Sequence, residues 1–293
     1  MGKLITAAAF MTLMTMGCVQ DPETVLSDSE NIRDLLQSSG SVAMTPLDGQ
    51  GERGGGKDAE FPEHWWRSLT SEEPMEFIFE NDPAAGVCTV TVIRTLEAAF
   101  NIDVTHDGVL NPGVKPVSDI RCRRVILQRT GEETDPHGGW EVTHITPAVF
   151  SLNSGLEQQV YVQSMALYAG DELLWECRSP DTFYSVKDGL PVLEPGTQVR
   201  VEAEVLHTNP VYEPPYYVYV HGPCPAWPRH WMNDEGLWGD IAAGDGVFSY
   251  EWYVEGTSDH WFVAVDVLDA DTMLDQEEDD YDSGAWGILA LRS

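Results

Sequence analysis

The densest group of potential ligand residues lies in the segment NDEGLWGDIAAGDGVFS, residues 233–249. Three aspartates, Asp234, Asp240 and Asp245, alternate there with four glycines. Ca²⁺ takes about six to eight oxygen ligands, often from carboxylates on a turn-forming loop. Glycines adopt positive φ at no steric cost, and aspartate side chains cap backbone amides, so the same residues also suit a tight turn without an ion. The segment therefore predicts either a calcium site or a self-hydrogen-bonded connection between two strands.

A helix-loop-helix calcium motif does not fit this segment, because Gly236 and Trp238 would stand at its third and fifth positions and donate no side-chain oxygen. The segment resembles instead a recurrent loop of bacterial extracellular sandwich domains, in which Asp-x-Gly, Gly-Asp and Ala-Gly-Asp-Gly precede a strand. These elements are residues 234–236, 239–240 and 243–246. The resemblance implies a connection between strands. Ca²⁺ is the candidate cofactor because three converging carboxylates would otherwise repel each other.

A second candidate site consists of aromatic residues between positions 211 and 231. Tyr217, Tyr219, Trp227 and Trp231 could form a platform on which sugar rings stack. Tyrosines at alternate strand positions also pack into cores and against sheet edges, so both interpretations stay open. The alternative function that follows is carbohydrate binding beside the aspartate loop.

Candidates for acid–base chemistry are His64, His106, Asp119 and His144, since histidine and carboxylates are the usual proton carriers. The chain has no Gly-x-Ser-x-Gly, no His-Glu-x-x-His, no phosphate loop and no dinucleotide fingerprint. We therefore expect no catalytic residue, and small-ligand or enzymatic use of residues 61–152 is kept as an alternative.

The chain is strongly acidic, with a formal net charge of -33 and only 16 lysines and arginines in 293 residues. Such a surface repels nucleic acid and anionic lipid head groups, so neither is an expected partner. Acid enrichment also fits a salty habitat, general solubility or divalent-cation binding, and composition does not choose among these causes.

The chain begins with one cation, Lys3, followed by an uncharged stretch to Met16 and then Gly17-Cys18. This order is typical of a secretory signal peptide and is too short for a membrane-spanning helix. The ending resembles the bacterial lipoprotein signal, which implies lipidation of Cys18, a membrane anchor and a place in the cell envelope, on the outer-membrane or surface side. The alternative is a buried N-terminal helix with an ordinary cysteine.

The other cysteines are Cys88, Cys122, Cys177 and Cys224, with no Cys-x-x-Cys spacing, so zinc and iron–sulfur ligation are poorly supported. In an exported protein an even number permits disulfides, and we predict Cys88 with Cys122 because both lie in strand-like runs. Free buried thiols are an equally good interpretation.

The elements that must position these residues follow from periodicity. Ser27 and Glu30 form a possible capping box before a helix that presents Ile32, Leu35 and Leu36. FPEHWWRSLT predicts one or two helical turns with packed tryptophans. From Met75 the period changes to two, which predicts long antiparallel strands.

These elements and the strand GGWEVTHI give residues 61–152 a resemblance to the cone-shaped α+β fold of the nuclear transport factor and scytalone dehydratase superfamily. A β-sandwich is the competing interpretation of this half.

Residues 153–293 read as short strands separated by turn clusters, the pattern of a β-sandwich. Pro195-Gly196 and HWFVAVDVLDADT resemble immunoglobulin-like or fibronectin-like modules of bacterial surface proteins. The alternation predicts that Trp261, Val263, Val265 and Val267 face the core. It leaves His260, Asp266 and Asp269 near the rim.

The expected fold is mainly β, with an α+β part of short helices and a curved antiparallel sheet, followed by an immunoglobulin-like β-sandwich. The expected divisions are a lipoprotein signal peptide at 1–17, an acidic, glycine-rich linker with a short helix at 18–60, a cone-like domain at 61–152 and the sandwich at 153–293. The expected function is a non-enzymatic envelope lipoprotein for adhesion, assembly or binding of an envelope protein or glycan.

Overall fold

The structure is a computed structural model that describes residues 26–40, 64–153, 157–222, 229–255, 260–277 and 280–293. Its fold is mainly β, as expected, with antiparallel pairing almost throughout. The helices are α1 (Asp28–Ser38) and α2 (Ala270–Leu274), with short 3-10 turns η2 (Pro83–Ala85) and η3 (Pro136–Gly139). The predicted signal peptide, Cys18 and most of the predicted linker lie outside the described residues.

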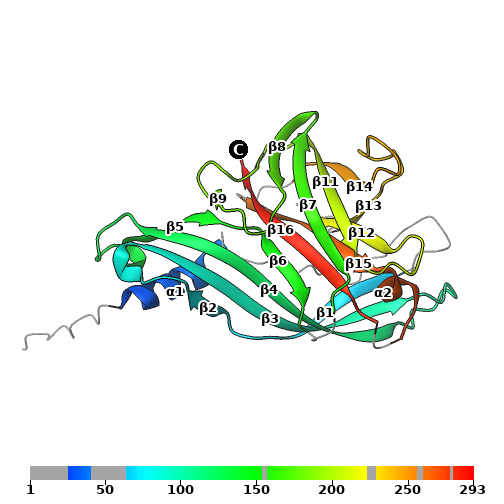
Figure 1. The fold of residues 1–293 in the computed structure, drawn as a ribbon, viewed down its shortest axis with the longest axis horizontal. Coiled ribbons are helices and arrows are strands. Elements are labelled where there is room, and N and C mark those ends of the chain that lie inside the picture. The colour runs from blue at the N-terminus through cyan, green and yellow to red at the C-terminus, as the bar shows by residue number, and fades with distance from the viewer. Residues whose placement is uncertain (1–25, 41–63, 154–156, 223–228, 256–259, 278–279) are drawn as a thin grey trace, which may run out of the picture.

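The larger sheet has 12 strands, and its main path runs β1-β3-β4-β6-β16-β15-β12-β13. These strands are β1 (His64–Glu72), β3 (Val87–Asp103), β4 (Gly113–Arg129), β6 (Ala148–Leu152), β12 (Tyr216–His221), β13 (Arg229–Met232), β15 (His260–Asp269) and β16 (Ser283–Arg292). The short strands β2 (Glu76–Phe79), β5 (Trp140–Ile145), β9 (Tyr184–Ser185) and β10 (Val192–Leu193) pair at its edges. Figure 1 shows β3 and β4 running along the length of the molecule.

Strand β16 lies between β6 and β15, so hydrogen bonds join residues 148–150 to residues 285–287. Strand β5 pairs with β9 in the same way, through His144 and Ser185. The sheet is therefore continuous across the expected division between residues 152 and 153.

The smaller sheet has the order β14-β11-β7-β8, with strands β7 (Val160–Ala169), β8 (Glu172–Cys177), β11 (Gln198–His207) and β14 (Val247–Tyr253). It stands over one end of the larger sheet, where β7 contacts β15 and β16 (Figure 1). Their facing side chains, including Leu167, Val201, Val265 and Ile288, form one continuous apolar core. Two packed sheets bury their apolar faces against each other, which explains the two layers.

The predicted inward alternation of β15 is confirmed, because Trp261, Val263, Val265 and Val267 all belong to this core. Asp266, on the opposite face, was expected near the rim, and this prediction is wrong because its exposed fraction is 0%. Asp269 is buried too, and the side chain of His260 lies outside the described part of the chain.

A second apolar core explains why the opposite face of β15 is buried. Trp65 of β1, Phe100 of β3, Tyr219 of β12 and Tyr281 pack together in it. The guanidinium of Arg229 in β13 donates to the backbone carbonyl of Trp65, which links the last strand of the main path to the first. The larger sheet is thus curved until its two ends touch, and both of its faces are covered there.

The predicted N-terminal helix is confirmed as α1. Ser27 accepts a hydrogen bond from the Glu30 amide, and the Glu30 carboxylate accepts from the Ser27 amide, which completes the capping box. Ile32 and Leu36 are buried in the larger core, and α1 lies near η3 and β5. This packing supplies the stability that an 11-residue helix lacks on its own.

Two other predictions are wrong. The helical turns expected at residues 61–70 are strand β1 from His64 onward, in which Trp65 and Arg67 are buried between less buried neighbours. Cys88 and Cys122 are free thiols, because Cys88 stands opposite Leu127 and Cys122 opposite Ile93 in the register of β3 and β4. Cys177 is also free, and Cys224 lies outside the described residues. Within the described residues, no helix is long and apolar enough to cross a membrane.

Candidate functional site

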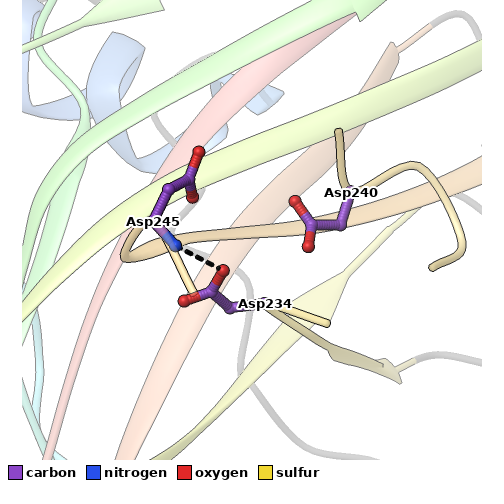
Figure 2. Close-up of side chains that lie close together, drawn as sticks. All are labelled: Asp234, Asp240 and Asp245. Atoms are coloured by element: carbon purple, nitrogen blue, oxygen red, sulfur yellow. Dashed lines mark hydrogen bonds between the residues drawn. The ribbon is translucent and has the colours of Figure 1, made fainter. Parts of the chain in front are cut away.

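The aspartate loop, residues 233–246, connects β13 to β14. An isolated bridge between Asn233 and Ser249 closes its base, and Asn233 is buried. One carboxylate oxygen each of Asp234, Asp240 and Asp245 lies within 4.8 Å of the others. Figure 2 shows the three side chains arranged around a common space. Residues 11 positions apart are thus brought together, as the sequence interpretation required.

Hydrogen bonds to the backbone hold the aspartates in place. Asp234 accepts from the amides of Gly244 at 2.7 Å, Asp245 at 3.1 Å and Gly246 at 2.9 Å. Asp240 accepts from the Gly236 amide, and Asp245 from the Val247 amide at 3.0 Å. These contacts are those of a self-hydrogen-bonded turn, so the turn interpretation is supported by the geometry as well.

Glycine is required at one position of the aspartate loop for two reasons. Gly239 has φ +99°, and a Cβ atom there would stand 3.1 Å from the Cβ of Glu251. A side chain would therefore meet both backbone strain and a close neighbour. The adjacent Trp238 has φ +51° although it is not glycine. The loop is thus held in one shape, and that shape sets the spacing of the carboxylates.

Chemically, three clustered carboxylates suit a hard cation. Each oxygen can accept more than one bond, so amide contacts leave lone pairs for a metal, and water can complete the shell. Asp234 and Asp240 are half-buried and Asp245 is exposed, so solvent reaches the space between them. The arrangement is chemically compatible with Ca²⁺ and with a solvated turn.

The predicted sugar-stacking platform is not formed by its two tyrosines. Tyr217 and Tyr219 are 4% and 6% exposed and belong to the second core. The ring of Tyr219 packs edge-on against that of Trp65 there, with the ring centroids 5.0 Å apart. Trp231 is half-buried, and its ring lies edge-on to that of Trp238 in the aspartate loop, with the ring centroids 6.3 Å apart. Trp227 lies outside the described residues.

The candidate acid–base residues do not converge. In the strand register, His64 of β1 stands opposite Asp103, at the C-terminal end of β3. His144 of β5 stands opposite Ile126, which is at the other end of the long β3–β4 hairpin. His106 is an exposed turn residue. Asp119 is buried, unlike His106, and its negative charge lies close enough to Arg67 to raise the pKa of the guanidinium.

A charged group that the sequence interpretation missed lies inside the curved sheet. Arg67 of β1 donates two hydrogen bonds to Asp266 of β15, at 2.6 and 3.1 Å, and its Nε donates to the Tyr281 hydroxyl at 2.9 Å. Nε2 of His221 lies 3.2 Å from the same carboxylate. Arg67 and Asp266 are 199 positions apart, so no local pattern could pair them. The only sequence signal was a lone acid among valines in VAVDV.

The electrostatics of this pair follow from burial and attraction. Burial opposes the charged forms of both groups, but the attraction between them outweighs it, so the pKa of Arg67 lies well above its usual value and that of Asp266 below. Burial lowers the pKa of His221 despite its contact with Asp266. The stable state is therefore a buried bidentate ion pair of Arg67 and Asp266 beside a neutral His221. Both partners of the pair are already ionised, so the pair forms without proton transfer between side chains.

No protein-family model, curated protein or solved structure matches this chain. The assignment of a function thus depends on the sequence patterns and on the geometry of the described residues.

Proposed function

We propose that this protein is a lipid-anchored component of the bacterial cell envelope, with a non-catalytic β-rich body that serves adhesion, assembly or binding, and with Ca²⁺ bound by the aspartate loop. The observation that carries the calcium part is the approach of the three carboxylates of Asp234, Asp240 and Asp245 to within 4.8 Å. Like charges at this distance repel, and a divalent cation among them removes the repulsion.

The body of the protein supports a binding or structural role more than a catalytic one. The candidate histidines lie apart, at the start of β1, between β3 and β4, and in β5, and the charges of the buried Arg67–Asp266 pair already neutralise each other. The packing of the smaller sheet against β15 and β16 of the larger sheet is compatible with the proposed immunoglobulin-like module. The partner in this proposal is an envelope protein or glycan, and the outer membrane is the proposed address.

Calorimetric titration with CaCl₂ of the metal-stripped protein tests the calcium site. We expect heat of binding and a rise in melting temperature for the wild type, since a ligand that binds only the folded chain stabilises it. Asp240→Asn and Asp245→Asn should each weaken binding by about tenfold or more, because each removes a carboxylate charge from the site.

Glu235→Gln is the matched control, since Glu235 is an exposed acid of the same loop outside the triad. It should bind Ca²⁺ like the wild type. A wild-type protein that gives neither heat nor a melting shift would leave the self-hydrogen-bonded turn as the role of the aspartate loop.

Cell fractionation tests the anchor. Cys18→Ala removes the residue that would carry the acyl chains. We expect this variant to move from the membrane fraction to the soluble fraction, because several acyl chains on one cysteine provide the durable attachment. Cys88→Ala is the control for cysteine loss and should stay in the membrane fraction. Retention of the Cys18 variant in membranes would reject the anchor.

A further inference from the structure

A junction between the two sheets gathers three titratable residues away from the aspartate loop. His207 ends β11 of the smaller sheet, Asp269 ends β15 of the larger sheet, and Asp282 directly precedes β16. Nε2 of His207 lies 2.6 Å from Oδ1 of Asp269, and both side chains are more than nine-tenths buried. The Asp269 amide donates to the backbone carbonyl of Asp282 at 3.0 Å.

Asp282 joins the same junction to the start of β7. Its Oδ2 accepts a hydrogen bond of 2.7 Å from the amide of Gln159, and the Gln159 carbonyl accepts from the amide of Thr208. Asp282 is only 8% exposed, and its Oδ1, which is buried, has no hydrogen-bond partner among the described residues. A buried carboxylate oxygen without a donor is costly when it carries charge.

The two hydrogen bonds of His207 fix its tautomer. Its Nδ1 accepts from the Asn209 amide at 3.0 Å, so Nδ1 carries no hydrogen and Nε2–H donates to Asp269. Adding a proton to Nδ1 would break the bond to Asn209. The titratable side chains that act on Asp282 are Asp269, His207 and Tyr161. Asp269 repels the charge of Asp282, whereas His207 attracts it.

We propose that the Asp282 carboxyl is a proton-binding position that tightens the junction between the two sheets in mildly acidic medium. The proton occupies the carboxyl group with the unpartnered oxygen and removes the repulsion from Asp269. Strands β7 and β11 of one sheet and β15 and β16 of the other are held together at this position, so the device acts on the contact between the sheets.

The direction of the pH effect follows from linkage. Burial, the largest influence, raises the pKa of Asp282 to about 6, and the amide of Gln159, the charge of His207 and the nearby amide of Val160 only partly oppose it. An acid whose pKa is higher in the folded than in the unfolded chain binds a proton more tightly when folded, so folding becomes more favourable as the pH falls. The window lies between about pH 6 and about pH 4, the ordinary range of an aspartate.

Urea unfolding at pH 7.5 and pH 5.0 tests the proposal with the full chain. Asp282→Asn keeps the shape and removes the titration. We expect acidification to lower the unfolding constant of the wild type by about tenfold more than that of the variant. Asp171→Asn, an exposed acid in a turn, is the charge-matched control and should follow the wild type.

Equal pH dependence of wild type and Asp282→Asn would overturn the proposal and point to another group such as His207. If Asp282→Asn does not fold, carbon-13 NMR of aspartate-labelled wild type decides. A resonance assigned to Asp282 with a midpoint near pH 6 supports the proposal, and a midpoint below about pH 4.5 rejects it.

Hydrogen exchange corrected for intrinsic rates provides the local readout. Residues 157–161, 207–209 and 268–277 should become more protected at pH 5.0 than at pH 7.5 in the wild type but not in Asp282→Asn. The aspartate loop contributes none of these residues, so the expected result does not require bound calcium.

Discussion

The buried Arg67–Asp266 pair and the aspartate loop both place aspartates close to other charged or polar groups, but they differ in the source of compensation. Asp266 is fully buried and finds its partner in the guanidinium of a distant strand. The three carboxylates of the aspartate loop are reached by solvent and accept hydrogen bonds from backbone amides. Within the described residues, none of them forms a salt bridge with a cationic side chain. A charge withdrawn from water must be neutralised by the fold itself, whereas solvent or an ion can do this for an exposed group.

The comparison predicts its largest effect at Asp266. Asp266→Asn leaves the Arg67 charge buried without its counter-charge and should cost about 3–5 kcal/mol of unfolding free energy. Because the pKa of Asp266 is lowered, the wild-type contribution is present above about pH 4 and is lost as the pH falls below the folded pKa. Urea unfolding at pH 7 followed by circular dichroism measures the loss.

A double variant sharpens this result. Arg67→Met with Asp266→Leu removes both charges and should cost less than Asp266→Asn alone, since apolar residues often replace a buried ion pair without loss. Asp188→Asn, an exposed acid, should change the unfolding free energy by less than about 0.5 kcal/mol. A single variant as stable as this control would mean that the buried pair does not require its charge.

A smaller effect is expected in the aspartate loop. Asp234→Ala removes the acceptor of three backbone amides and should cost about 1–2 kcal/mol when measured with a chelator present, because those amides regain water. Urea unfolding with EDTA gives the value, and Glu235→Gln is again the control. A loss as large as that of Asp266→Asn would erase the contrast between the two regions.

Local patterns predicted the elements whose determinants are local. The capping box of α1 needs only Ser27 and Glu30, and the alternation from Trp261 to Val267 fixes which side chains share a face of β15. The convergence of the three aspartates was also accessible, because turn residues close a short loop. Each of these depends on contacts within about a dozen residues.

The failures share a cause that lies in long-range packing. Alternation assigns side chains to two faces but does not tell what covers the second face, so Asp266 was expected near solvent. Its burial requires the larger sheet to curve until Arg229 of β13 reaches Trp65 of β1. The same contact explains why Trp65 and Arg67 form a strand where helical turns were predicted. The tyrosines of β12 face this enclosed core, which decides for core packing over the sugar platform between the two interpretations that the sequence left open.

The placement of β16 between β6 and β15 has a consequence for biosynthesis. Until residues 283–292 have been translated, the strands made earlier present unpaired edges on both sides of the missing strand. Unpaired strand edges of this kind pair readily with other chains, so the incomplete sheet is prone to aggregation until this strand is added. Completion of the larger sheet therefore waits for residues 283–292, which fill the gap between β6 and β15.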